Sequence, residues 1–285
     1  MLAKCLKYDL KAVFSVWWIA ALTLLGLSFP AGYCVRVIVT TVKQTPFLAY
    51  FGVRIYKFAT AAFVITTLIL VFVRYYQNFF QDEGYLTFTL PVRRETLFWS
   101  KVLCGVISVF AAVAVIAASD AIAMAMIPGD ARDEIGGLFS VLGVLPAVED
   151  IHLLGVNFSN LGIWGYIYAG EILLGLSLYG FSGLLAVYLC ITLGAVVAKK
   201  HKILAAVGFG YAFNTAMSIA GMIVMVIVAM FGFSLSEAVP GLFESPENYA
   251  FLALCGLLIC IVLAVINTIL AFANIGCLER KLNLS

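Results

Sequence analysis

Long apolar runs, separated by shorter segments that gather most of the charged residues, form the dominant pattern of the chain. Six such runs occupy residues 12–34, 55–73, 102–128, 172–198, 203–236 and 249–278. A helix needs about 20 mainly apolar residues to cross the hydrocarbon core of a bilayer. Each run is about that long or longer, and Asp120 is the one acidic residue inside any of them. The pattern therefore predicts six membrane-spanning helices.

Composition agrees with a membrane protein, because 64% of the residues are hydrophobic and only 11% are charged, where about 25% charged is usual in soluble domains. This composition excludes a secreted disulfide-rich module, a nucleic-acid-binding protein and a disordered chain. The seven cysteines form no CxxC pair, so neither a disulfide framework nor a metal site is indicated. We expect an all-α integral membrane protein with one transmembrane domain over residues 1–285.

Lysine and arginine are distributed unevenly between the two sides of this arrangement. If the first span runs outward, the inner side carries 12 of the 17 basic residues. The other five are Arg36, Lys43, Arg54, Lys57 and Arg132. Because cytoplasmic loops of membrane proteins carry an excess of Lys and Arg, we predict that the N- and C-termini are both cytoplasmic.

Residues 2–14 form an amphipathic segment before the first run. Three lysines (Lys4, Lys7 and Lys11) recur at helical spacing on one face, and leucines line the other. Such a segment is typical of a helix that lies in the membrane interface and binds anionic lipid. A cytoplasmic extension of the first spanning helix is the alternative.

Three further segments lie between the spans. Residues 74–101 form the longest cytoplasmic connection, in which RYYQNFF continues the second helix, DEG interrupts it and RRETLFWSK leads into the third. Residues 129–171 form an outer segment, whose apolar middle is too short to span and suits a re-entrant or surface helix. Residues 235–248 form a second outer loop.

Motifs for catalysis are missing from the sequence. It holds no HExxH, no GxSxG and no phosphate-binding GxxxxGK[ST]. We therefore expect no enzymatic activity and no bound cofactor in this chain.

Two acidic residues need an explanation, because a carboxylate in hydrocarbon is costly unless it is solvated or paired. Asp120 lies within the third run and Glu171 at the start of the fourth. Both could line a pathway for a cationic substrate or a coupling ion. Alternatively, Asp120 is protonated or hydrogen-bonded between helices, and Glu171 lies at the interface. Asn214, Asn267 and Asn274 are expected to hydrogen-bond between helices.

The segment FFQDEGYLTFTLPVRRETLFWSKVL at residues 79–103 resembles the cytoplasmic loop of type-2 ABC transporter permeases (the ABC-2 family), especially bacterial ones of the Gram-positive type. The matching positions are Phe80, Asp82, Glu83, Gly84, Tyr85, Leu86, Phe88, Thr89, Leu90, Pro91, Val92 and Arg93. The remaining resemblance is one of architecture: an amphipathic N-terminus, six spans and short loops.

This resemblance implies a permease subunit of an ABC exporter in a bacterial cytoplasmic membrane. Residues 79–91 would hold a coupling helix that docks on a separate ATPase subunit, which binds the ATP and magnesium. The expected contact residues are Asp82, Glu83, Gly84, Tyr85, Leu86 and Phe88. A second permease, identical or different, would complete the exporter, and an amphipathic or hydrophobic compound such as a peptide antibiotic or a lipid-like molecule would leave outward.

Two other function classes remain open from the sequence. An ion- or proton-coupled secondary transporter would use Asp120 and Glu171 to bind the coupling ion. A sensor or assembly scaffold would bind a cytoplasmic partner through residues 79–91 without moving a substrate.

Overall fold

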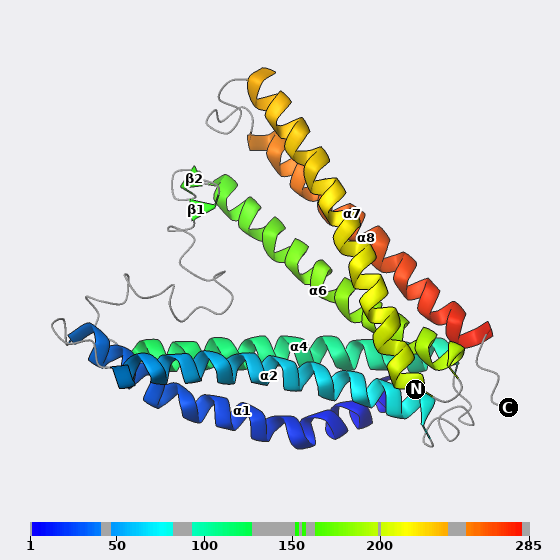
Figure 1. The fold of residues 1–285 in the computed structure, drawn as a ribbon, viewed down its shortest axis with the longest axis horizontal. Coiled ribbons are helices and arrows are strands. Elements are labelled where there is room, and N and C mark those ends of the chain that lie inside the picture. The colour runs from blue at the N-terminus through cyan, green and yellow to red at the C-terminus, as the bar shows by residue number, and fades with distance from the viewer. Residues whose placement is uncertain are drawn as a thin grey trace. The chain divides into compact units, whose positions relative to one another are not determined.

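The computed structural model describes residues 2–40, 47–81, 93–126, 152–153, 156–157, 163–198, 201–238 and 249–280 of the chain. Six long helices account for nearly all of this part of the chain (Figure 1). They are α1 (Leu2–Thr40), α2 (Phe47–Phe80), α4 (Arg94–Ala125), α6 (Ile163–Val197), α7 (Lys202–Ala238) and α8 (Tyr249–Arg280). Two short antiparallel strands of two residues each precede α6: β1 (His152–Leu153) and β2 (Val156–Asn157).

All six helices contain a segment that is long and apolar enough to cross a membrane. The all-α, six-span architecture expected from the sequence is therefore confirmed, and the chain is a multi-pass membrane protein. The helices extend beyond the apolar runs: α1 has 39 residues, about 58 Å at 1.5 Å per residue, whereas a hydrocarbon core is about 30 Å thick.

Several boundaries expected from the sequence change because the helices extend beyond the apolar runs. Residues 2–14 continue without a break into the rest of α1, as in the second of the two alternatives for this segment. The outer segment predicted for 129–171 is shorter, because α6 already begins at Ile163. The outer loop predicted for 235–248 is also shorter, since α7 reaches Ala238. The apolar middle of the first outer segment lies outside the described residues.

The described helices fall into two compact units, residues 1–147 and 148–285. In the first unit α1 packs against both α2 and α4, which also contact each other. In the second unit α6 packs against both α7 and α8. Each unit is therefore built around its first helix.

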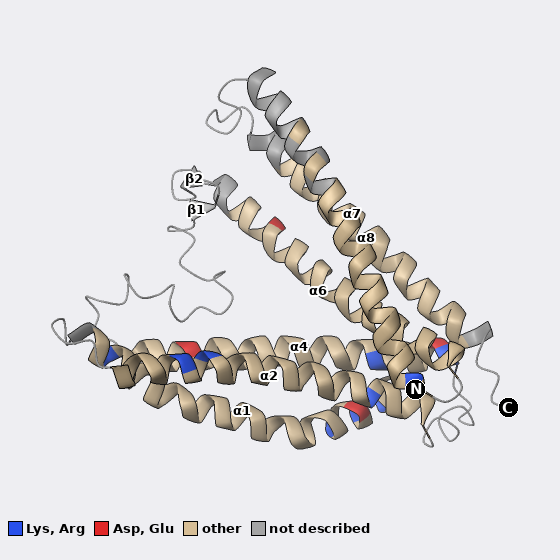
Figure 2. Cartoon of the chain, in the orientation of Figure 1, with Lys and Arg blue, Asp and Glu red and all other residues tan. Residues whose placement is uncertain are grey.

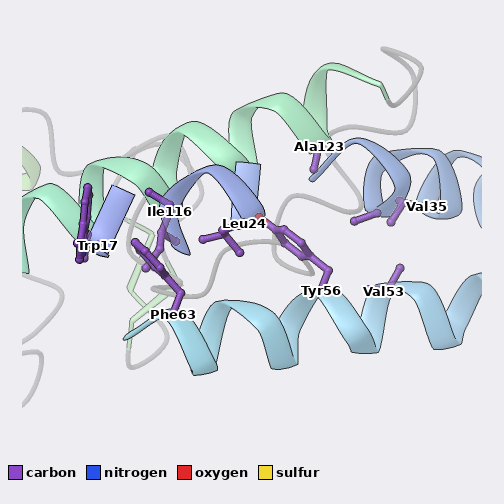
Figure 3. Packing of buried hydrophobic residues seen from close by; sticks show 11 residues of the cluster. Trp17, Leu24, Val35, Val53, Tyr56, Phe63, Ile116 and Ala123 are labelled. Carbon is purple, nitrogen blue, oxygen red and sulfur yellow. The ribbon is translucent and has the colours of Figure 1, made fainter. Parts of the chain in front are cut away.

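The core of the first unit lies along one stripe of α1. Trp17, Ala21, Leu24, Ala31 and Val35 recur at intervals of three to seven residues, and all of them are buried. They meet side chains from α2 and α4, as Figure 3 shows for Phe63, Tyr56, Val53, Ile116 and Ala123. This periodicity follows the 3.6-residue turn of the helix and gives α1 a single packed face.

Polar groups also join the helices within this core. Trp17 donates a hydrogen bond from Nε1 to Thr67 Oγ1 of α2, at 3.0 Å. Gly32 lies so close to α4 that an added Cβ would be 2.7 Å from the carbonyl oxygen of Ala123. Small residues permit such close backbone approach between membrane helices.

Charged residues of the first unit gather toward the two ends of its helices, and the middle of the unit is uncharged (Figure 2). This is the distribution expected of helices whose central part lies in hydrocarbon and whose ends reach water or lipid headgroups.

The second unit is joined by a regular series of contacts between α6 and α8. Asn267 Nδ2 donates to the Leu178 carbonyl at 3.0 Å, and Asn274 Nδ2 donates to the Leu185 carbonyl at 3.1 Å. Both pairs are separated by 89 residues, so α6 and α8 run parallel with one constant register. The predicted interhelical role is confirmed for these two asparagines. Asn214 is exposed on α7 and accepts from Ser218 of its own helix.

Candidate functional site

A buried ionic cluster joins α1, α2 and α4 near one end of the first unit. The Asp9 carboxylate of α1 forms a salt bridge with Lys101 of α4. Its Oδ1 also lies 3.5 Å from Asn78 Nδ2 of α2, and its Oδ2 accepts from Ser100 Oγ of α4 at 3.3 Å. Asp9 is only 6% exposed and Lys101 only 8%. Both carboxylate oxygens are therefore used, by groups from two different helices.

We define the Asp9 cluster as Asp9, Asn78, Ser100 and Lys101. It lies close to the connection between α2 and α4. Asn78 is two residues from the end of α2 at Phe80, and Lys101 is seven residues from the start of α4 at Arg94. The cluster thus holds together the two helix ends that flank residues 81–93, and it attaches both to α1.

Aromatic side chains stiffen the same end of α2. The ring centroids of Tyr75 and Phe79 are 5.1 Å apart in an edge-on arrangement, and those of Tyr76 and Phe80 are 6.1 Å apart. Tyr75 and Phe79 are almost completely buried. The helix therefore reaches the connection as a packed element rather than as a frayed terminus. This agrees with the expectation that RYYQNFF continues the second helix.

Asp9 was not predicted as a functional residue from the sequence. A signal was present, because Asp9 is four residues before Val13 and eight before Trp17, so it lies in phase with the buried stripe of α1. Lys4, Lys7 and Lys11 are exposed instead. An acidic residue on the buried face needs an ion-pair or hydrogen-bond partner, yet Lys101 is 92 positions away, and no local pattern points to it.

A second polar cluster joins α2 to α4 farther along the same helices. Tyr56 donates a hydrogen bond to Asp120 Oδ1 at 2.7 Å, and its hydroxyl also lies 2.7 Å from Ser119 Oγ. Tyr56 is 2% exposed, and Figure 3 shows its side chain directed away from α2 toward the other two helices. The alternative in which Asp120 is hydrogen-bonded between helices is confirmed, and its use in a substrate pathway stays a prediction.

Glu171 belongs to the second unit, where it lies on α6 close to α8. Its carboxylate approaches Gly256 so closely that a Cβ there would collide with Oε2. Its backbone carbonyl accepts from Cys260 Sγ at 3.7 Å. Glu171 is partly exposed, and its interfacial position stays a prediction. Asp120 and Glu171 therefore contact different helices in different units.

The expected contacts for an ATPase partner, Asp82, Glu83, Gly84, Tyr85, Leu86 and Phe88, lie outside the described residues. Within the described part of the chain, no group of three or more His, Cys, Asp or Glu residues could hold a metal ion. All seven cysteines are free thiols.

Comparison with known proteins gives no match: no protein-family model, no curated protein and no solved structure is significantly similar to the chain.

Proposed function

We propose that this chain is the transmembrane permease subunit of an ABC exporter and moves an amphipathic or hydrophobic substrate outward, driven by a separate ATPase subunit. The observation that carries the proposal is the segment 79–93, whose sequence resembles the coupling loop of ABC-2 permeases. Six apolar helices of spanning length are the framework that such a subunit requires.

The chemistry of the connection suits a protein partner. Asp82 and Glu83 offer carboxylates for ion pairs or hydrogen bonds, and Tyr85, Leu86 and Phe88 offer the apolar groups that dominate protein interfaces. Gly84 between them permits a sharp turn of the backbone. A loop that met only water would not need so many apolar side chains.

The packing of α2 and α4 supports a mechanical role for this connection. In the proposed mechanism, ATP binding closes the ATPase subunits, and the docked residues 79–91 move with them. Because both helices are packed at their ends beside the connection, they pass the movement into the membrane instead of absorbing it. The substrate then leaves between this permease and a second one.

The test is to purify the tagged chain from its native membrane in mild detergent and to identify the co-purifying proteins by mass spectrometry. We expect a stoichiometric ATPase with wild type and its loss from the Asp82→Arg/Glu83→Arg variant. The matched control is Asp133→Arg/Glu134→Arg, which changes the same dipeptide on the expected outer side and should retain the ATPase.

If wild type brings no ATPase under conditions that preserve oligomers, the proposal fails. A secondary transporter driven by an ion or proton gradient then becomes the better hypothesis, because Asp120 places a carboxylate within a spanning helix. Loss of the ATPase from the control variant as well would contradict the assignment of the contact to residues 82 and 83.

A further inference from the structure

We propose that Asp9 is a positioning residue that makes α1 move together with the two helix ends flanking residues 81–93. The inference rests on the proposed function, since it assigns to α1 a share of the movement that the ATPase subunit produces. The sequence of residues 79–93 alone would suggest that only α2 and α4 pass on the movement of the ATPase subunit. The Asp9 carboxylate adds α1 to these two helices.

The geometry of the Asp9 cluster supports this role. Lys101 and Asn78 approach Oδ1, and Ser100 donates to Oδ2. Because the carboxylate is held at both oxygens, α1 cannot rotate about its axis or slide along α4 without breaking these interactions. A purely apolar contact at the same place would be non-directional and would allow such slippage.

The energetics also distinguish this cluster from ordinary packing. Removing one partner of a buried ion pair leaves an uncompensated charge and is strongly destabilising, whereas an apolar replacement of the whole pair is often tolerated. A buried pair is thus weak evidence for stability, but it can fix one relative arrangement of helices. Here the fixed arrangement is that of α1 with the ends of α2 and α4.

The rest of α1 can carry the movement through the unit. Near its other end Gly32 lies against the Ala123 backbone of α4, and the stripe of buried side chains between Trp17 and Val35 packs α1 along its length. A displacement imposed at Asp9 therefore reaches the opposite end of the unit through continuous helix and continuous packing. Lys4, Lys7 and Lys11 are exposed, so they leave the packed face free of competing charge.

The experiment measures amide hydrogen exchange by mass spectrometry on the permease–ATPase complex, with and without a non-hydrolysable ATP analogue. In wild type we expect the analogue to change deuterium uptake in peptides from both α1 and the start of α4. In Asp9→Asn and in Lys101→Met we expect the change in α1 to be lost and the change at the start of α4 to remain. Ser100→Ala keeps the ion pair and should show a partial loss.

Matched controls remove exposed charges close to the cluster. Lys11→Met lies two residues from Asp9, and Glu95→Gln removes an exposed carboxylate in the first turn of α4. Both should retain the nucleotide-dependent change in α1. A merely structural role for Asp9 would raise uptake in α1 equally with and without nucleotide, and this outcome would overturn the inference.

The experiment gives different results if the inference is wrong and if the proposed function is wrong. Absence of an ATPase from the wild-type preparation overturns the proposed function and this inference with it. The inference alone is overturned if the complex is present and the nucleotide still changes deuterium uptake in α1 as strongly as in wild type. This result would have to hold in Asp9→Asn, Lys101→Met and Ser100→Ala. Measuring the milder Ser100→Ala variant keeps the test decisive if the two charge-removing variants fold poorly.

Discussion

Two buried or partly buried aspartates in the first unit are stabilised by different means. Asp9 is paired with the cation of Lys101, whereas Asp120 accepts a hydrogen bond from the hydroxyl of Tyr56. The sequence identified Asp120, because an acidic residue within a long apolar run is conspicuous. It did not identify Asp9, because an aspartate among lysines in a short amphipathic segment is usually solvated. The partners of both aspartates are far away along the chain, 64 positions for Tyr56 and 92 for Lys101, and pattern analysis does not reveal them.

The Tyr56 hydroxyl provides a test at this scale. Replacing Tyr56 by Phe removes the hydroxyl that donates to Asp120. The Asp120 carboxylate, at the interface of α2 and α4, then has one hydrogen bond fewer. We expect the free energy of unfolding to fall by about 1–2 kcal/mol, in the range measured for buried and interhelical hydrogen bonds. Denaturant-induced unfolding of the purified protein in mixed micelles measures this change.

Tyr50→Phe is the control, since Tyr50 is on the same helix and is 48% exposed. It should leave the free energy of unfolding almost unchanged. Equal effects of the two substitutions would show that the hydroxyl of Tyr56 contributes nothing specific.

At the scale of the helices, the ends that flank residues 81–93 were predictable. The expected continuation through RYYQNFF and the return at RRETLFWSK agree with the end of α2 at Phe80 and the start of α4 at Arg94. The starts of α2 and α6 were predicted too late, at residues 55 and 172 instead of Phe47 and Ile163, because only the apolar runs were counted as helix. In the structure α2 continues across Arg54, which lies just before the predicted run.

Close packing of α1 on α4 gives a test of how two elements fit. In Gly32→Ala the new Cβ would lie 2.7 Å from the carbonyl oxygen of Ala123 and 3.0 Å from its Cα. Backbone atoms cannot move aside as a side-chain tip can, so we expect the two helices to be forced apart. The free energy of unfolding should fall by about 1–3 kcal/mol, as for other overpacked cores.

Gly26→Ala is a matched control on the same helix, because no atom lies within 4 Å of a Cβ at that position. It should be neutral or stabilise the protein by up to about 1 kcal/mol through helix propensity. Both variants are compared with wild type in the same unfolding titration. A Gly32→Ala protein as stable as Gly26→Ala would contradict the close approach of α1 and α4.

At the scale of the whole molecule, the sequence predicted the six spans. The grouping of the described helices into two compact units was not predicted, because it depends on which helices pack together and not on where they begin. The three spanning helices of each unit follow one another directly along the chain.

The orientation of the molecule is tested by reporter fusions in a bacterial host. A fluorescent protein that matures only in the cytoplasm should fluoresce when fused after residue 285, and an alkaline phosphatase that is active only outside should be active after residue 44. The expected result follows from the 12 basic residues on the inner side against five on the outer side. The reverse pattern would place residues 81–93 outside the cell and would exclude docking of a cytoplasmic ATPase.

The constant spacing of 89 residues between the bonded positions of α6 and α8 has a consequence for changes in chain length. Deleting one residue of α6 between Leu178 and Leu185 would leave one asparagine facing its carbonyl and turn the other away by about 100°. Adding or removing residues between α7 and α8 changes the spacing in number but leaves both pairs facing each other. Changes in chain length between the bonded segments of α6 and α8 thus preserve both hydrogen bonds. A change in length between the two bonded positions of either helix breaks one of them.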